Sequence, residues 1–182
     1  MIACHQPTAA AVLFRFDPAT PFAPWTVIDD PTMGGRSRSQ FVPTDGGTAC
    51  FTGVVSLENG GGFCSVRSPE FSPAAAATGV QLRVRGDGRT YKVCLHTRHM
   101  LPGTSYRATF EPRPGEWEDV RIPLSEFVLM RFGARAGVTP VDPARVTALS
   151  LLIADRQDGP FALELAHVGL VETAGGGKNT ED

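Results

Sequence analysis

The sequence has no long run of apolar residues. No window approaches the roughly 18 consecutive apolar residues that a membrane-spanning helix needs, so no transmembrane segment is expected. Residues 1–11 lack the cationic stretch and apolar core of a signal peptide, and Arg15 interrupts the apolar run at 9–16. The segment is also not Arg-rich like a transit peptide. These features predict a strand at the N-terminus and a cytoplasmic protein.

The sequence also has no excess of positive charge. It contains 17 Lys and Arg residues against 19 Asp and Glu residues, and its pI is near 6.1. Broad binding to a phosphate backbone needs a basic surface. The two Trp and two Tyr residues offer few rings for stacking bases. We therefore expect no nucleic-acid partner.

Cysteine is scarce, and its spacing is uninformative for metals. The four cysteines form no C-x-x-C pair, which argues against a zinc site or a thioredoxin-like motif. Cys50, Cys64 and Cys94 stand within apolar, strand-like segments. This placement predicts buried, reduced thiols without a catalytic role.

Turn residues, by contrast, are abundant. The 20 Gly and 15 Pro residues divide the chain into short segments that alternate apolar and polar residues, the pattern of β-strands joined by turns. Gly86-Asp87-Gly88 predicts a hairpin between two such segments. The predicted strands cover residues 12–16, 39–42, 49–56, 62–68, 80–85, 91–96, 105–110, 117–122, 148–154 and 161–171.

Helical signals are weak, and only residues 123–127 and 142–145 favour a turn of helix. Many short strands joined by Gly and Pro turns predict an all-β fold, an antiparallel β-sandwich of the jelly-roll type. We expect the sandwich to span residues 11–172. A flexible N-terminus (1–10) and a disordered C-terminal tail (173–182), which has no large apolar residue, are expected to flank it.

No catalytic motif is complete. The segment 35–39 reads G-R-S-R-S and lacks the final glycine of a nucleophile elbow. The glycines at 34–35 and 60–62 are not followed by the Lys-Ser/Thr pair of a phosphate-binding loop. His96 and His99 would point to opposite faces of a continued strand. We therefore expect a protein that is not an enzyme and needs no cofactor.

Three polar, glycine-bearing segments stand out at 25–37, 56–63 and 154–161. Alternate loops of a sandwich can gather at one end, so one hypothesis is a shared binding rim. The alternative is that the same side chains only cap turns and pair with one another. Their carboxylates could also hold a structural calcium ion. The candidate rim residues are Asp29, Asp30, Met33, Arg36, Glu58, Asn59, Arg67, Asp155 and Gln157.

The same segments carry a resemblance to a known family. Residues 29–37, D-D-P-T-M-G-G-R-S, resemble the N-D-G-V-M-G-G-x-S signature of the complex I intermediate-associated protein family. Residues 56–63, S-L-E-N-G-G-G-F, are similar to its S-L-E-N-N-G-G-F, and residues 85–91 to its R-G-D-G-R-x-Y. Pro and Thr stand at 31 and 32, where Gly and Val are usual. The remaining matches follow in the family's order at Trp117, Ile122-Pro123, Phe127 and 155–161.

The resemblance implies a galactose-binding-domain-like jelly roll, similar to some carbohydrate-binding modules. It also implies a role in assembly, because mitochondrial members assist assembly of respiratory complex I and plant and cyanobacterial relatives are linked to photosystem biogenesis. We therefore expect a domain that binds a protein partner as a chaperone or assembly factor for such a complex. The alternative is a carbohydrate or small-ligand module. Trp25 and Trp117 stand beside apolar strand residues, which favours core positions over exposed sugar platforms.

Overall fold

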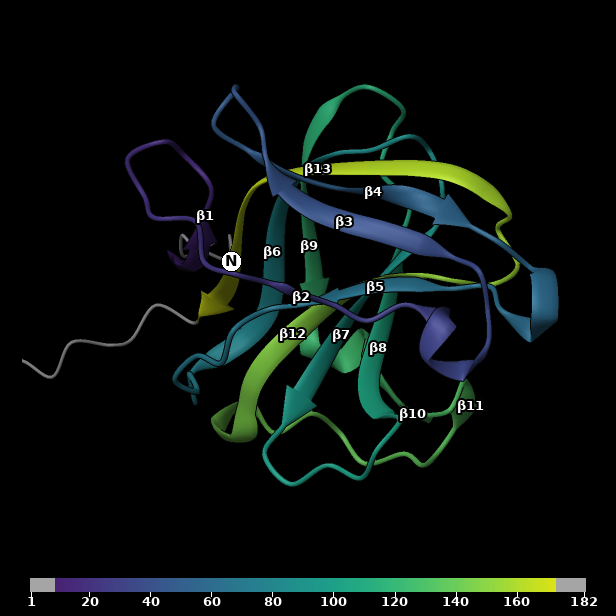
Figure 1. Ribbon diagram of the computed structural model, residues 1–182. Helices are drawn as coiled ribbons and strands as arrows, with labels where there is room; N and C mark the ends of the chain where they lie inside the picture. The colour runs from purple at the N-terminus through teal and green to yellow at the C-terminus, as the bar shows by residue number, and fades with distance from the viewer. Residues whose placement is uncertain (1–8, 173–182) are drawn as a thin grey trace, which may run out of the picture.

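The computed structural model describes residues 9–172 and shows two antiparallel β-sheets packed face to face (Figure 1). Helix accounts for only 7% of the residues, which confirms the all-β prediction. The four helical elements are short 3-10 turns. They are η1 (Asp30–Met33), η2 (Glu58–Gly60), η3 (Leu124–Glu126) and η4 (Pro143–Arg145).

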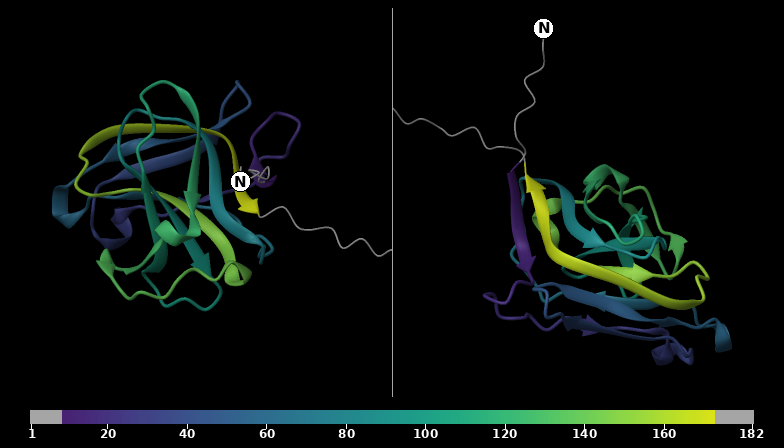
Figure 2. Two further views of the ribbon diagram at one scale, coloured as in Figure 1. Left: turned by 180° about the vertical axis from the view of Figure 1, so that it is seen from behind. Right: turned by 90° about the horizontal axis from the view of Figure 1, so that it is seen from above.

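The six-stranded sheet is organised around one long strand, β13. Its first half pairs with β4 and its second half with β1, while β6 pairs along its other edge. β1 and β13 therefore run side by side, as the right-hand view of Figure 2 shows. The sheet order is β3 (Arg38–Pro43), β4 (Ala49–Val55), β13 (Gly159–Glu172), β6 (Ala77–Arg85) and β9 (Trp117–Pro123), with β1 (Ala9–Arg15) added at β13.

The seven-stranded sheet carries the surface on which a site is found below. Its central strands, β8, β7, β12 and β5, pair antiparallel, with one irregularity in the β12–β7 register between Val146 and Ala148. The sheet order is β11 (Ala134–Arg135), β10 (Val128–Arg131), β8 (Thr104–Phe110), β7 (Tyr91–Thr97), β12 (Val146–Ile153), β5 (Cys64–Arg67) and β2 (Thr26–Val27).

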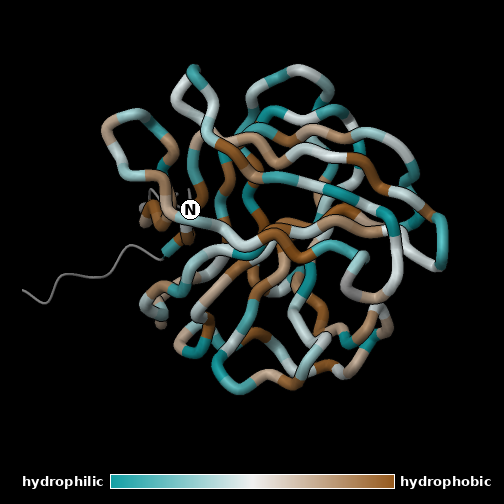
Figure 3. Tube along the Cα trace, viewed as in Figure 1, coloured by the Kyte–Doolittle hydropathy of each residue, from teal (hydrophilic) through white to brown (hydrophobic). Residues whose placement is uncertain are grey.

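The core lies between the two sheets and is built from alternate positions of their strands. Hydrophobic positions recur along the strands, whereas many of the connecting turns are hydrophilic (Figure 3). Leu82, Leu151 and Leu163 are fully buried there. Trp25 is also a core residue, with its ring centroid 4.8 Å from that of Phe41. The prediction of a core position is therefore confirmed for Trp25 but wrong for Trp117, which is half-buried and has the Arg85 guanidinium over its ring.

All ten predicted strands are present, and both predicted helical turns appear as η3 and η4. Three short strands, β2, β10 and β11, were not predicted. Residues 9 and 10 belong to β1, although a flexible N-terminus was predicted to extend to residue 10. The rest of that predicted segment, and the predicted C-terminal tail, lie outside the described residues.

The predicted hairpin at Gly86–Gly88 is wrong, because β6 and β7 belong to different sheets. The physical reason is a set of bonds that direct this segment across the sandwich. Gly86 forms a bridge with Pro114, and the Asp87 carboxylate accepts hydrogen bonds from the Tyr91 hydroxyl at 3.0 Å and the Ala162 amide at 2.9 Å. The turn therefore connects the two layers instead of two neighbouring strands.

The thiols of Cys50, Cys64 and Cys94 are free, and Cys4 lies outside the described residues. Cys64 and Cys94 are buried as predicted, whereas Cys50 is half-buried. Burial raises the pKa of Cys64 to about 12 and that of Cys94 to about 11. Both side chains are therefore protonated at neutral pH.

Candidate functional site

The first two polar segments are joined through the carboxylate of Asp30, which is 1% exposed. Oδ1 accepts a hydrogen bond from the Ser37 amide at 2.8 Å. Oδ2 accepts from the Ser37 hydroxyl at 2.5 Å, the Gly62 amide at 2.6 Å and the Phe63 amide at 3.1 Å. One side chain therefore satisfies four donors and fixes η1 against the segment that follows η2.

These bonds also set the ionisation of the two adjacent aspartates. Burial alone would raise the pKa of Asp30, but the hydrogen bonds from Ser37, Gly62 and Phe63 outweigh it and lower the pKa. For Asp29 the balance is reversed. Burial raises its pKa, and the hydrogen bonds from Ser39 and Ser65 offset this only in part. Both carboxylates are thus engaged inside the protein.

Two positions beside the Asp30 carboxylate have room only for glycine. A Cβ at Gly35 would lie 2.3 Å from Asp30 Oδ1, and a Cβ at Gly61 would lie 2.6 Å from Asp30 Oδ2. Real side chains do not approach this closely, so any larger residue must displace the carboxylate. The glycines of these two motifs therefore make room for a buried aspartate.

Arg36, Glu58 and Asn59 lie outside this buried cluster. Arg36 Nη1 is 2.8 Å from Glu58 Oε2, and the two side chains are 65% and 62% exposed. Such a pair adds little stability because water competes for both charges. Asn59 has a left-handed backbone, with φ of 56°, which asparagine tolerates well. All three residues are exposed at the same corner of the fold.

The third polar segment is tied to the start of β7. The Gln157 side chain accepts a hydrogen bond from the Thr90 amide at 2.9 Å and donates to the Thr90 carbonyl at 2.7 Å. Asp155 forms an ion pair with Lys92, at 2.5 Å between Nζ and Oδ1. Gln157 therefore holds the turn together, whereas Asp155 reaches a side chain on the outer face of the seven-stranded sheet.

That outer face is hollowed into a cleft of about 1390 Å³. Its floor comes from the polar faces of β5, β12, β7 and β8, and its rim from the loops around them. The cleft is lined by residues 28, 33, 60–63, 65, 67, 70, 92, 94, 96–105, 107, 109, 128, 130, 132, 133, 135, 147, 150, 152 and 154–156.

Strand register explains which side chains meet on the floor. Arg67, Ser150, Cys94 and Arg107 are direct neighbours across β5, β12, β7 and β8. Residues opposite one another in a sheet present their side chains to the same face. The floor therefore has an arginine at each end of a row, with a serine and a buried thiol between them.

His96 lies two residues beyond Cys94 on the same face. Its Nε2 is 2.7 Å from the Ser150 hydroxyl. Burial, with the nearby charges of Arg67 and Arg107, lowers the pKa of His96 to about 3. An imidazole with so low a pKa is a weak proton acceptor at neutral pH, so the contact with Ser150 is a poor nucleophile–base pair.

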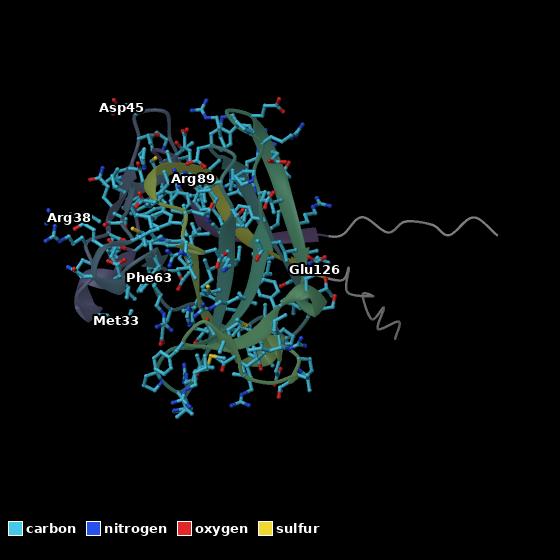
Figure 4. The ribbon with its side chains drawn as sticks, turned by 90° about the vertical axis from the view of Figure 1, so that its right-hand side faces the viewer. Met33, Arg38, Asp45, Phe63, Arg89 and Glu126 are labelled. Atoms are coloured by element: carbon cyan, nitrogen blue, oxygen red, sulfur yellow. The ribbon has the colours of Figure 1, made fainter. Side chains whose placement is uncertain are left out.

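The rim of the cleft carries three exposed apolar side chains. Met33, Leu101 and Phe132 are 68%, 61% and 71% exposed, and all three line the cleft. Figure 4 shows Met33 and Phe63 near one another at one corner. The Phe132 ring covers Gly103, where an added Cβ would lie 2.3 Å from a ring atom. An aromatic ring is thus packed against the neighbouring loop at the mouth of the cleft.

The structure separates the nine predicted rim residues into groups. Met33, Arg67 and Asp155 line the cleft. Asp29 and Asp30 are buried, so the prediction that they lie on a rim is wrong. The reason is that their carboxylates take up backbone donors of the loops. The remaining four, Arg36, Glu58, Asn59 and Gln157, lie outside the cleft lining.

Lys92, His96, Arg107 and Phe132 were not predicted as site residues. A signal existed for the first three, because polar residues at 92 and 96 and at 105, 107 and 109 alternate with core positions. Alternation identifies an outward face, but not that the face is concave.

Two further properties follow from the described part of the chain. Within residues 9–172 there is no group of three or more His, Cys, Asp or Glu side chains arranged to hold a metal ion. Calcium binding therefore stays an untested hypothesis. The same residues contain no helix that is long and apolar enough to cross a membrane.

Comparison with solved structures places the fold among carbohydrate-binding modules. The family 11 module of the cellulase Lic26A-Cel5E from Clostridium thermocellum matches with a TM-score of 0.65, over 92% of this chain and 97% of that one, at 12% identity. The module CBM29-2 matches with a TM-score of 0.54, over 91% of this chain and 92% of that one, at 9% identity. These likenesses confirm the jelly-roll sandwich.

Curated relatives share more sequence. Complex I intermediate-associated protein 30, mitochondrial, from Drosophila melanogaster is 29% identical over 195 residues, covering 93% of this chain and 65% of the relative. The mouse protein of the same name is 27% identical over 184 residues, covering 88% of this chain and 56% of the relative. The chain thus spans between about half and two thirds of these relatives' length.

The relatives are named mitochondrial, which contradicts the predicted cytoplasmic location. That prediction rested only on the lack of a targeting signal in the N-terminal residues, and such a lack does not establish a location. The resemblance noted in the sequence, in contrast, is confirmed. A sequence model described as complex I intermediate-associated protein 30 (CIA30) matches residues 14–165. The chain therefore belongs to the complex I intermediate-associated protein 30 family.

Proposed function

We propose that this chain is a non-enzymatic binding domain that holds a protein partner in the cleft, and that the partner is part of a complex I assembly intermediate. The observation that carries the proposal is the open cleft of about 1390 Å³ with its exposed apolar rim. The names of the relatives supply the link to complex I intermediates.

The apolar rim favours a protein partner. Met33, Leu101 and Phe132 are exposed at the mouth of one cleft, although they come from separate loops. Burying such side chains against a partner is worth about 25 cal/mol per Å² of apolar area. Clustered exposed apolar residues next to polar ones are typical of protein interaction surfaces. The rim would therefore supply affinity, and the polar floor would supply selectivity.

A sugar ligand is the weaker alternative. Sugar-binding surfaces use exposed aromatic rings, which combine a large apolar area with a polar group. Trp25, Tyr91 and Tyr106 are core residues. Trp117 is on β9 in the other sheet, with the Arg85 guanidinium 5.2 Å from its ring centroid. None of the four Trp and Tyr residues thus lines the cleft.

The chemistry of the floor also favours binding over catalysis. His96 contacts Ser150, but its pKa of about 3 makes it a weak base. Lys92 is neutralised by Asp155. Cys94 is 3% exposed, and burial raises its pKa to about 11. The floor therefore has no strong base at His96, and the thiol of Cys94 is in its unreactive protonated form.

The test is affinity capture from the native host with two matched double variants. Leu101→Asn with Phe132→Asn changes the rim, and Asn suits the left-handed backbone at position 132, where φ is 47°. Val54→Asn with Val138→Asn changes exposed apolar residues outside the cleft. Equal melting temperatures would show that both variants fold.

We expect the wild type and the Val54/Val138 variant to capture complex I subunits, identified by mass spectrometry, and the Leu101/Phe132 variant to lose them. Equal capture by all three proteins would overturn the cleft as the binding surface. Capture of glycans on an array, without any complex I subunit, would favour the sugar alternative.

A further inference from the structure

The cleft carries a positive charge that the rest of the protein does not share. Of its lining residues, Arg67, Lys92, Arg98, Arg107, Arg135 and Arg156 are cationic. Only Glu70 and Asp155 are carboxylates. The whole chain, by contrast, has a formal net charge of −2. The excess of cations is therefore a local property of this surface.

The cleft arginines also lack carboxylate partners. In the part of the chain that the structure describes, none of the five has an Asp or Glu oxygen within 4.0 Å. Arginines elsewhere are mostly paired, as Arg36 is with Glu58, Arg83 with Asp119 and Arg85 with Glu164. Among the described residues, Lys92 is the one cation of the cleft with a carboxylate partner, Asp155.

Two of these arginines occupy the floor itself. Arg67 and Arg107 are half-buried, at the two ends of the row through Ser150 and Cys94. Three strand spacings separate their α-carbons, which is about 14 Å. Arg107 Nε donates to Ser105 Oγ at 2.9 Å, which leaves its other nitrogens available. A half-buried cation without a counter-ion is costly, and a bound anion would relieve that cost.

We propose that the cleft binds an acidic segment of the partner protein, whose carboxylates pair with Arg67 and Arg107 while apolar side chains contact the rim. The proposal rests on the proposed function and adds the chemistry of the partner. Arginine is suited to the task because its planar guanidinium binds a carboxylate through two hydrogen bonds. The hydroxyls of Ser105 and Ser150 provide neutral hydrogen-bonding groups alongside.

An anionic membrane surface is negatively charged like an acidic segment and is the other candidate to bind the cleft. The geometry disfavours it, since Arg67 and Arg107 are on the floor of a concave surface whose rim carries Leu101 and Phe132. A flat bilayer would contact the rim without reaching the floor. A peptide chain can enter the cleft and reach both arginines.

The test compares two fluorescein-labelled dodecapeptides by fluorescence anisotropy. Both contain the same four leucines and four glycines, and they differ in carrying four glutamates or four glutamines. The floor variant is Arg67→Gln with Arg107→Gln. The control is Arg38→Gln with Arg121→Gln, which removes the same charge from two exposed arginines outside the cleft that also have no carboxylate partner among residues 9–172.

We expect the wild type to bind the glutamate peptide at least about tenfold more tightly than the glutamine peptide, since charge-assisted bonds are the strong ones. The affinity of the floor variant for the glutamate peptide should fall by about tenfold or more, and that of the control by less than about threefold. Circular dichroism and melting temperature establish that each variant is folded.

Equal affinity for the two peptides would overturn the proposal that the bound segment is acidic. The proposed function would still stand if the rim variant fails to capture complex I subunits. Equal losses of affinity for the glutamate peptide in the floor variant and the control would mean that net charge alone determines binding. That result would also overturn the proposal. Binding of neither peptide, or binding only to phosphatidylserine vesicles, would likewise refute it. If the glutamate peptide binds as expected but no complex I subunit is captured, the proposed function fails instead.

Discussion

The carboxylate of Asp30 accepts a hydrogen bond from the Gly62 amide at 2.6 Å, although 32 positions separate the two residues in sequence. This contact joins the two glycine-bearing motifs that resemble the family signature. It gives those motifs a structural meaning, because they position Met33 and residues 60–63, which form one corner of the cleft.

Replacing Asp30 should therefore destabilise the fold. Asp30→Ala removes four hydrogen bonds and leaves the amides of Ser37, Gly62 and Phe63 without their acceptor. We expect a loss of at least about 3 kcal/mol in the free energy of unfolding, measured by urea denaturation. Glu58→Ala breaks only an exposed ion pair and should cost less than about 0.5 kcal/mol. Similar losses for both variants would contradict the structural role of Asp30.

A methyl group at Gly35 should have a comparable effect. Its Cβ would lie 2.3 Å from Asp30 Oδ1, so the carboxylate must move away from its donors. We expect Gly35→Ala to lower the free energy of unfolding by about 2–4 kcal/mol. Gly46→Ala is the control, because its nearest neighbour would be Thr44 Oγ1 at 3.7 Å. It should change stability by less than about 0.5 kcal/mol. An unchanged Gly35→Ala protein would mean that the Asp30 cluster tolerates rearrangement.

His96 should make stability depend on pH. Its pKa is lowered from 6.5 to about 3, by burial and by Arg67 and Arg107. Between these two values the unfolded chain binds a proton that the folded chain does not. The stability contributed by neutral His96 is therefore complete above about pH 6.5 and is lost as the pH falls toward 3.

Urea denaturation at about pH 7 and pH 5 measures this effect. The wild type should lose more stability over that interval than His96→Gln, which keeps a neutral hydrogen-bonding side chain beside Ser150. His99→Gln, in an exposed loop position, should behave like the wild type. Identical pH dependence in all three proteins would show that His96 is protonated as readily in the fold as in the unfolded chain.

The thiol of Cys94 should resist alkylation although it is part of the cleft floor. It is 3% exposed, and burial raises its pKa to about 11. The thiolate that attacks iodoacetamide is therefore rare near pH 8. Peptide mass spectrometry after native-state labelling should show Cys94 modified more slowly than the half-buried Cys50. Faster modification of Cys94 would reveal opening of the sheet at the cleft.

The sequence was sufficient for the strands that alternate over five or more residues, such as β6 and β7, because alternation marks one buried face. It was insufficient for β2 and β11, which have two residues each and carry no periodicity. Local turn signals also failed at Gly86–Gly88. There one partner of Asp87, the Ala162 amide, comes from the distant strand β13, so the turn chemistry alone could not distinguish a hairpin from a crossing.

The candidate site was harder to predict than the fold. The prediction placed the site on the polar loops, yet the carboxylates of Asp29 and Asp30 accept hydrogen bonds from backbone donors inside the protein. The cleft depends on the curvature of a complete sheet and on which loops rise above it. Arg67 and Arg107 are 40 positions apart in the sequence, and only the order of four strands brings them to one floor.

Site-specific photocrosslinking tests the central claim, that a complex I assembly partner lies in the cleft, most directly. The photoreactive analogue p-benzoylphenylalanine is placed at Phe132 on the rim or, as the control, at Val54 on the outer face of the other sheet. After irradiation in the native host, mass spectrometry identifies the crosslinked proteins. The account predicts crosslinks to complex I subunits from position 132 and none from position 54. Crosslinks from position 54 alone, or none from position 132, would contradict it.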